Sequence, residues 1–205
     1  MMACGSDAIT EVPATRWDAR ALAQALADMA ALGDRARHGG FVCGADLVDG
    51  SRFTVSPAEV TAMDPQQRLL LERGYAALHA SGLGRVVLAG SGAGIFVGVE
   101  NKDFADVPSS PGGSVYSATG TSLSIACGRL SYVLGLHGPC VSYSTACSGA
   151  LTACHAAHCA LERGECDDAL LSGVMLVLMP ATSVGFAMAG ICLLYTSDAA
   201  DEVRR

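Results

Sequence analysis

The chain alternates between a β pattern and a helical pattern, which restricts it to folds that layer helices on a sheet. Cys140 to Ser144 form a short β-rich run, Thr145-Ala146 form a bend, and Cys147 to Glu162 are small residues with helical periodicity. The apolar run from Ala169 to Met179 then predicts a second buried strand. This order indicates an α/β domain whose sheet is covered on both faces.

Earlier segments fit the same class of fold. Apolar spacing predicts helices over Trp17–Leu32, Asp64–Ala80 and Thr121–Leu134, and a buried strand over Gly94–Glu100. The polar run Asn101–Gly113 is expected to be a loop. The Asp64–Ala80 helix has one apolar face, and the opposite face is expected to carry the polar residues Gln66, Gln67, Arg68, Glu72 and Arg73.

A short helix is expected just before that one. Ser56 is the type of residue that caps a helix N-terminus, and Pro57 fits the first turn because its missing N–H is not needed there.

Composition excludes several classes of protein. Apolar residues make up 51% of the chain and charged residues 16%, which indicates a large buried fraction. The net charge of -7 comes from 20 acidic and 13 basic residues without a basic run, so a nucleic-acid partner is not expected. The charge-free segment from Ala169 to Ser197 is interrupted at Pro180, and its apolar run of about 11 residues is shorter than the ~20 that span a bilayer.

The N-terminus carries no secretory signal pattern. A cytoplasmic location is therefore expected. A plastid location is the alternative, because the natural start of the protein is expected to be missing from this sequence.

The nine cysteines include no C-x-x-C pair, so neither a zinc site nor a disulfide framework is predicted. Most are expected to be small buried hydrophobes. Cys147 differs because it lies where a strand meets a helix. Unpaired N–H groups and the helix dipole at such a junction favour a thiolate and can bind the oxygen of a tetrahedral intermediate. Tight helix packing explains the small neighbouring residues equally well, so the residues alone leave both interpretations open.

The segment GPCVSYSTACSGALTACHAAHCALERGECDDALLSGV resembles the nucleophile region of β-ketoacyl synthases, especially those of type I polyketide and fatty-acid synthases. Three further matches precede this segment in the expected order: EVPATRWD with Gly39-Gly40-Phe41, MDPQQRLLL from Met63, and GRLSYVLGL from Gly128. The resemblance implies a thiolase-like, layered α/β/α/β/α fold. Roughly its N-terminal half is expected in residues 1–191.

The same resemblance implies the chemistry. Cys147 would accept an acyl group from a phosphopantetheine thioester, and a malonyl unit on acyl carrier protein would then lose CO₂ and attack it. No tightly bound cofactor or metal is implied. Acyl carrier protein and a second copy of the protein are the implied partners, with the nucleophile strands near the dimer interface.

Two histidines complete this reaction in the family, and both come from its C-terminal half. His155 and His158 do not replace them, since they lie eight and eleven residues beyond Cys147, or ~12 Å or more along a helix. They are expected to be packing or surface residues. We therefore expect the chain by itself to be inactive.

The sequence departs from the family at three positions. Ser144 stands where the family usually has Asp, and Gly149 and Ala150 replace two serines of its Asp-Thr-Ala-Cys-Ser-Ser-Ser core. Another thiolase-superfamily acyltransferase and a non-catalytic subunit of a synthase dimer remain the alternatives. The pathway, polyketide or fatty acid, is left open.

The end of the chain is unlike the family. From Cys192 the sequence reads CLLYTSDAADE, which resembles the translation of a sequencing-library adaptor. Residues 192–205 are therefore expected to be a non-native tail.

Overall fold

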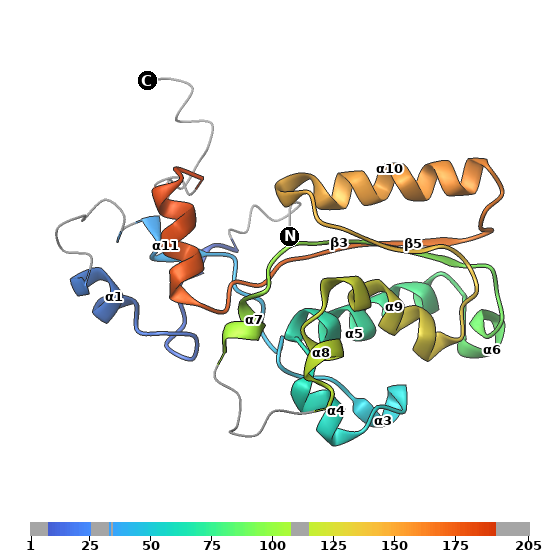
Figure 1. Cartoon of the computed structure of the whole chain (residues 1–205), viewed down its shortest axis with the longest axis horizontal. Coiled ribbons are helices and arrows are strands. Elements are labelled where there is room, and N and C mark those ends of the chain that lie inside the picture. The colour runs from blue at the N-terminus through green and yellow to red at the C-terminus, as the bar shows by residue number, and fades with distance from the viewer. Residues whose placement is uncertain (1–7, 26–32, 34, 108–114, 192–205) are drawn as a thin grey trace. The chain divides into compact units, whose positions relative to one another are not determined.

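A computed structural model describes residues 8–25, 33, 35–107 and 115–191, which fall into two compact units (Figure 1). One unit is Gly44–Leu176, and the other joins Met1–Cys43 to Val177–Arg205. Three predictions fall partly or wholly outside the described residues: the Trp17–Leu32 helix from residue 26 on, the Asn101–Gly113 loop from residue 108 on, and the tail 192–205.

The larger unit is built on a parallel sheet in the order β4-β3-β5. Its strands are β3 (Gly94–Val99), β4 (Cys140–Tyr143) and β5 (Ala169–Val174). Helices α5 (Pro65–Ala80) and α9 (Leu123–Leu134) cover one face, and α10 (Gly149–Glu162) covers the other (Figure 1). The predicted α/β layering is confirmed.

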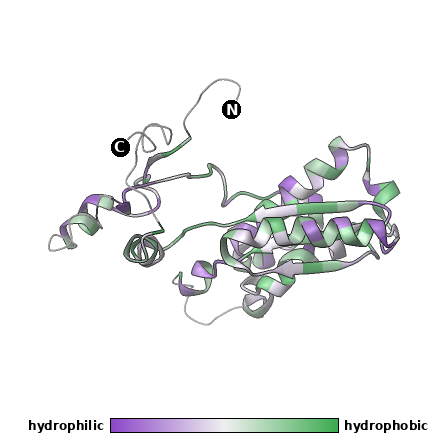
Figure 2. Ribbon diagram, turned by 90° about the horizontal axis from the view of Figure 1, so that it is seen from above, coloured by the Kyte–Doolittle hydropathy of each residue, from purple (hydrophilic) through white to green (hydrophobic). Residues whose placement is uncertain are grey.

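The central strand β3 is apolar along its whole length because both of its faces are covered. Ile95, Val97 and Val99 belong to the core under α5 and α9, and Phe96 belongs to the core under α10. All six strand residues are buried. Figure 2 shows apolar residues concentrated along the strands, while the helices alternate between polar and apolar positions.

Strand β5 is shorter than predicted. It ends at Val174, where its partner β3 ends at Val99, and Leu176 donates its N–H to Gln66 Oε1 at 3.2 Å in place of a strand partner. Leu171 is 41% exposed because β5 is an edge strand. The prediction of a fully buried strand to Met179 was therefore wrong in both length and burial.

Helix α5 begins as predicted, with Asp64 as its N-cap. The Asp64 carboxylate accepts from the N–H of Gln66 at 2.7 Å. Burial raises the pKa of this carboxyl above its ordinary value, although the hydrogen bonds from Gln66 oppose the shift.

The polar face predicted for α5 was wrong for Gln66 and Gln67, which are 2% and 3% exposed. The Gln66 amide donates to the carbonyl of Asn101 at 2.8 Å. The Gln67 amide donates to the carbonyls of Thr119 and Ser122 at 3.1 and 3.2 Å. Both side chains thus bond to backbone carbonyls of other segments of the chain instead of to water.

Helix α4 (Pro57–Ala62) begins as predicted, because the Ser56 hydroxyl accepts from the N–H of Glu59 at 3.2 Å. Glu59 also forms an ion pair with Arg129 of α9. Arg129 Nε donates to Gln67 Oε1 at 2.7 Å, and its side chain is only 7% exposed. One buried guanidinium therefore connects α4, α5 and α9.

Replacing Arg129 with methionine is expected to lower the free energy of unfolding by about 2–3 kcal/mol. The methionine fills similar space but leaves the Glu59 carboxylate and the Gln67 carbonyl without their donor. Urea denaturation followed by circular dichroism measures the change. Arg163→Met is the matched control, because Arg163 makes an exposed 3.8 Å pair with Glu165. Equal stability of the two variants would contradict the prediction.

Single-turn helices occupy the connections of the larger unit: α3 (Gly50–Phe53), α6 (Arg85–Leu88), α7 (Asp103–Asp106) and α8 (Ser117–Gly120). Helix α7 lies in the stretch predicted to be a loop. Asn101 supports it by accepting from the N–H of Asp103 at 3.3 Å.

In the smaller unit, β1 (Thr10–Glu11) pairs antiparallel with β2 (His38–Gly39). Helix α1 (Ala19–Ala25) begins just after Asp18, whose carboxylate accepts from the N–H groups of Arg20 and Ala21. Helix α11 (Pro180–Met188) begins at the proline that was expected to end a strand. Within the described ranges, no helix is both long and apolar enough to cross a bilayer.

Candidate active site

Cys147 follows the carboxyl end of β4, which lies beside the carboxyl end of the parallel strand β3. It is the middle residue of the 3₁₀ turn η3 (Ala146–Ser148), which leads directly into α10. The predicted strand-to-helix junction is confirmed. The predicted helix start at Cys147 is corrected, because the α-helix begins two residues later, at Gly149.

Hydrogen bonds of Thr145 and Ser148 help to hold this turn. The Ser148 hydroxyl and the Ser148 N–H both donate to the carbonyl of Thr145, at 2.7 and 3.2 Å. The Thr145 hydroxyl lies 3.2 Å from that of Thr152 on α10. Ala146 has φ +50°, a left-handed conformation that costs a residue with a Cβ about 1–3 kcal/mol. The surrounding contacts therefore keep a strained residue immediately before Cys147.

The start of α10 lies directly against the sheet. A Cβ added to Gly98 of β3 would lie 2.5 Å from the backbone N of Ala150 and 2.5 Å from the carbonyl carbon of Gly149. A Cβ added to Gly173 of β5 would lie 2.9 Å from that of Ala150. Small residues at 149 and 150, two of the three departures from the family pattern, therefore lie where α10 approaches the sheet closely.

The Cys147 thiol is exposed, with small residues on both sides. Other cysteines fit the expected buried role only in part. Cys127 and Cys166 are buried, and burial raises the pKa of the Cys166 thiol. Cys43 and Cys154 are exposed, so the expectation of burial was wrong for them. Cys4 and Cys192 lie outside the described residues.

Cys127 and Cys140 form a contact between α9 and the start of β4. A hydrogen bond from the Cys140 thiol lowers the pKa of the Cys127 thiol, and the same contact together with burial raises the pKa of Cys140. Cys140 lies at the opposite end of β4 from the Cys147 turn.

The histidines of α10 contact their own helix. His155 Nε2 lies 3.6 Å from Cys159 Sγ, and His158 Nε2 lies 3.3 Å from a Glu162 carboxylate oxygen. Both histidines are exposed. Of the two roles expected for them, packing or surface, the structure shows the surface one.

Glu100 is the site residue that the sequence analysis missed. It follows β3 directly, and its carboxylate accepts a hydrogen bond from the Ser144 hydroxyl and another, at 3.3 Å, from the N–H of Ala146. The available signal was its position, since a charged residue immediately after a buried parallel strand lies at the same edge as the end of β4.

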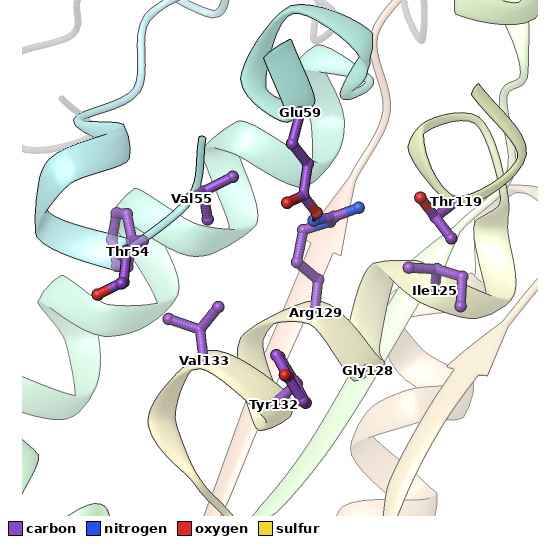
Figure 3. Close-up of a pocket in the computed structure, with 10 residues that line it drawn as sticks. Thr54, Val55, Glu59, Thr119, Ile125, Gly128, Arg129, Tyr132 and Val133 are labelled. Carbon is purple, nitrogen blue, oxygen red and sulfur yellow. Dashed lines mark hydrogen bonds and ion pairs between the residues drawn. The ribbon is translucent and has the colours of Figure 1, made fainter. Parts of the chain in front are cut away.

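A separate pocket of about 660 Å³ lies on the α9 side of the larger unit (Figure 3). Arg129 and Glu59 point toward each other within it. None of its lining residues belongs to η3 or α10: Phe53, Thr54, Val55, Glu59, Thr119, Ile125, Gly128, Arg129, Tyr132 and Val133. The pocket therefore does not supply groups to the Cys147 turn.

Comparison with known proteins identifies the class. Residues 1–201 match the family model described as "Beta-ketoacyl synthase, N-terminal domain". The chain therefore belongs to the β-ketoacyl synthase family and carries the N-terminal part of a ketosynthase domain.

Its curated relatives are much larger proteins. The phenolphthiocerol synthesis polyketide synthase type I Pks15/1 of Mycobacterium bovis is 42% identical over 188 residues, which cover 91% of this chain and 9% of that protein. The pikromycin polyketide synthase component PikAII of Streptomyces venezuelae is 43% identical over 192 residues, covering 91% of this chain and 5% of that protein.

Solved structures agree with this class. The ketosynthase from module 6 of the bacillaene synthase of Bacillus subtilis matches with a TM-score of 0.78 and 30% identity, covering 91% of this chain and 30% of that one. The fold is accordingly α/β and thiolase-like, and this chain holds part of it. The predicted family and fold class are confirmed.

Proposed function

We propose that Cys147 is the acyl acceptor of a condensing enzyme in polyketide or fatty-acid biosynthesis, a 3-oxoacyl-[acyl-carrier-protein] synthase in type. The observation that carries this proposal is the exposed thiol in a strained turn between β4 and α10. The relatives named above are polyketide synthases, which supports the polyketide alternative.

In the first step, the Cys147 sulfur attacks the carbonyl carbon of an acyl thioester. The new S–acyl bond forms, the carrier's S–C bond breaks, and the carrier thiol leaves with a proton. The nearby N terminus of α10 directs backbone N–H groups toward negative charge, which favours the oxyanion of the tetrahedral intermediate.

In the second step, malonyl thioester loses CO₂, and the electron pair of the broken bond forms a carbon nucleophile. That carbon attacks the acyl carbonyl, and the Cys147 thiolate leaves. The two histidines for this step are proposed to come from protein beyond this chain, so the chain by itself is proposed to be inactive.

The proposed substrates are phosphopantetheine-linked acyl and malonyl thioesters, delivered by acyl carrier protein, and no tightly bound cofactor is proposed. A homodimer is also proposed. Its support is the position of β4 at one edge of the sheet, with Val141 37% exposed. A cytoplasmic location is proposed as well, and the bacterial relatives lend no support to a plastid one.

A non-catalytic subunit of a synthase dimer is the second candidate, because Ser144 replaces the usual Asp beside the nucleophile. The test supplies the full-length protein with acyl thioester and malonyl-acyl carrier protein. Formation of a β-ketoacyl product with release of CO₂ supports the condensing enzyme. Binding of carrier protein without any product supports the non-catalytic subunit.

A further inference from the structure

In this chain, the carboxylate beside the nucleophile turn belongs to Glu100, which follows β3. The family pattern places a carboxylate at position 144, which follows β4. The turn has no acidic side chain at 144, where the family usually has Asp. Ser144 instead donates its hydroxyl hydrogen to the carboxylate of Glu100. The same oxygen, Oε2, accepts from the N–H of Ala146 at 3.3 Å.

The two contacts converge because β3 and β4 are parallel and in register. Gly98 pairs with Tyr143, so Glu100 and Ser144 leave the sheet at the same edge. An aspartate at 144 would reach the same N–H from within the turn, because an Asp side chain readily accepts from the backbone two residues ahead. Glu100 thus places a carboxylate where an Asp at 144 would place one.

We propose that Glu100 is a positioning residue for Cys147, and that its carboxylate replaces the one that is missing at position 144. Through Ala146 it fixes the left-handed residue that immediately precedes the nucleophile. Ser144 is its partner in this arrangement, so the Asp-to-Ser departure is compensated. This proposal rests on the function proposed for Cys147.

Amide hydrogen exchange of the 144–148 segment in the full-length protein tests the contact directly. Glu100→Ala removes the acceptor and is expected to accelerate exchange at Ala146 by about tenfold. Glu100→Gln is expected to accelerate it less, because the amide oxygen still accepts a hydrogen bond, although more weakly than a carboxylate. Glu162→Ala removes an exposed carboxylate at the far end of α10 and is expected to leave this segment unchanged. Unchanged exchange in Glu100→Ala would overturn the proposal.

Moving the carboxylate distinguishes positioning from general destabilisation. In the Glu100→Ala background, Ser144→Asp is expected to return exchange to within about twofold of the original chain. In the unmodified background, the same Ser144→Asp change places two carboxylates side by side and is expected to accelerate exchange. The same effect of Ser144→Asp in both backgrounds would overturn the proposal.

The acylation rate of Cys147 in the full-length protein is the functional readout. It is expected to fall about three- to tenfold in Glu100→Ala and to recover in Glu100→Ala/Ser144→Asp. A rate that falls but does not recover would overturn the positioning role. If the unmodified protein is never acylated, the proposed function fails, whereas the exchange pattern still tests the Glu100 contact.

Discussion

Replacing Cys147 with alanine is expected to abolish acylation of the full-length protein and to lower its rate of condensation by roughly a thousandfold or more. The reason is chemical, because no other group in the turn can form the thioester. Alanine fits the site without strain, since the turn is held by hydrogen bonds of Thr145 and Ser148 and not by the thiol. Intact-protein mass spectrometry after incubation with acyl thioesters measures the adduct.

Cys154→Ala is the matched control for this experiment. Cys154 is also exposed and lies on α10, seven residues beyond Cys147. Its replacement is expected to leave acylation and condensation close to their original rates. An adduct of normal yield in Cys147→Ala, or its loss in Cys154→Ala, would show that Cys147 is not the acyl acceptor.

Replacing Gly98 with alanine is expected to lower the free energy of unfolding by about 3 kcal/mol. The new methyl carbon would lie 2.5 Å from two backbone atoms at the start of α10, and backbone cannot rotate away as a side chain can. We expect α10 to shift from the sheet and to carry the Cys147 turn with it. Slower acylation of Cys147 should therefore accompany the loss of stability, which urea denaturation measures.

Gly128→Ala is the control with the opposite sign. Gly128 lies within α9, and a Cβ added there would meet no heavy atom within 4 Å beyond its chain neighbours and the backbone of its own helix. Alanine is favoured over glycine in a helix by about 1 kcal/mol, so this variant should be slightly more stable. Equal losses of stability in the two variants would mean that the helix–sheet contact at Gly98 is not the cause.

Much of the larger unit could be predicted from the order of residues. The apolar run at β3, the caps at Ser56 and Asp64, and the change of pattern after Tyr143 each depend on local chemistry, and the structure confirms each. The motif around Cys147 also identified the family. Local signals of this kind require only neighbouring residues.

The errors arose where a residue's partner is distant in the sequence. Gln66 looked solvent-facing, yet it bonds to a loop at Asn101 and to the backbone of Leu176, 35 and 110 residues away. Strand β5 was predicted too long because its end depends on where β3 ends. Helical or strand periodicity carries no information about such partners.

The sequence alone determined that the chain is α/β, that it resembles a ketosynthase, and that Cys147 lies between a strand and a helix. Only the tertiary structure decided which groups surround that cysteine. The parallel register of β3 and β4 brings Glu100 to Ser144 and Ala146, across 44 and 46 residues of sequence. The physical reason is that hydrogen bonding between strands, and not separation along the chain, sets which side chains meet at the edge of a sheet.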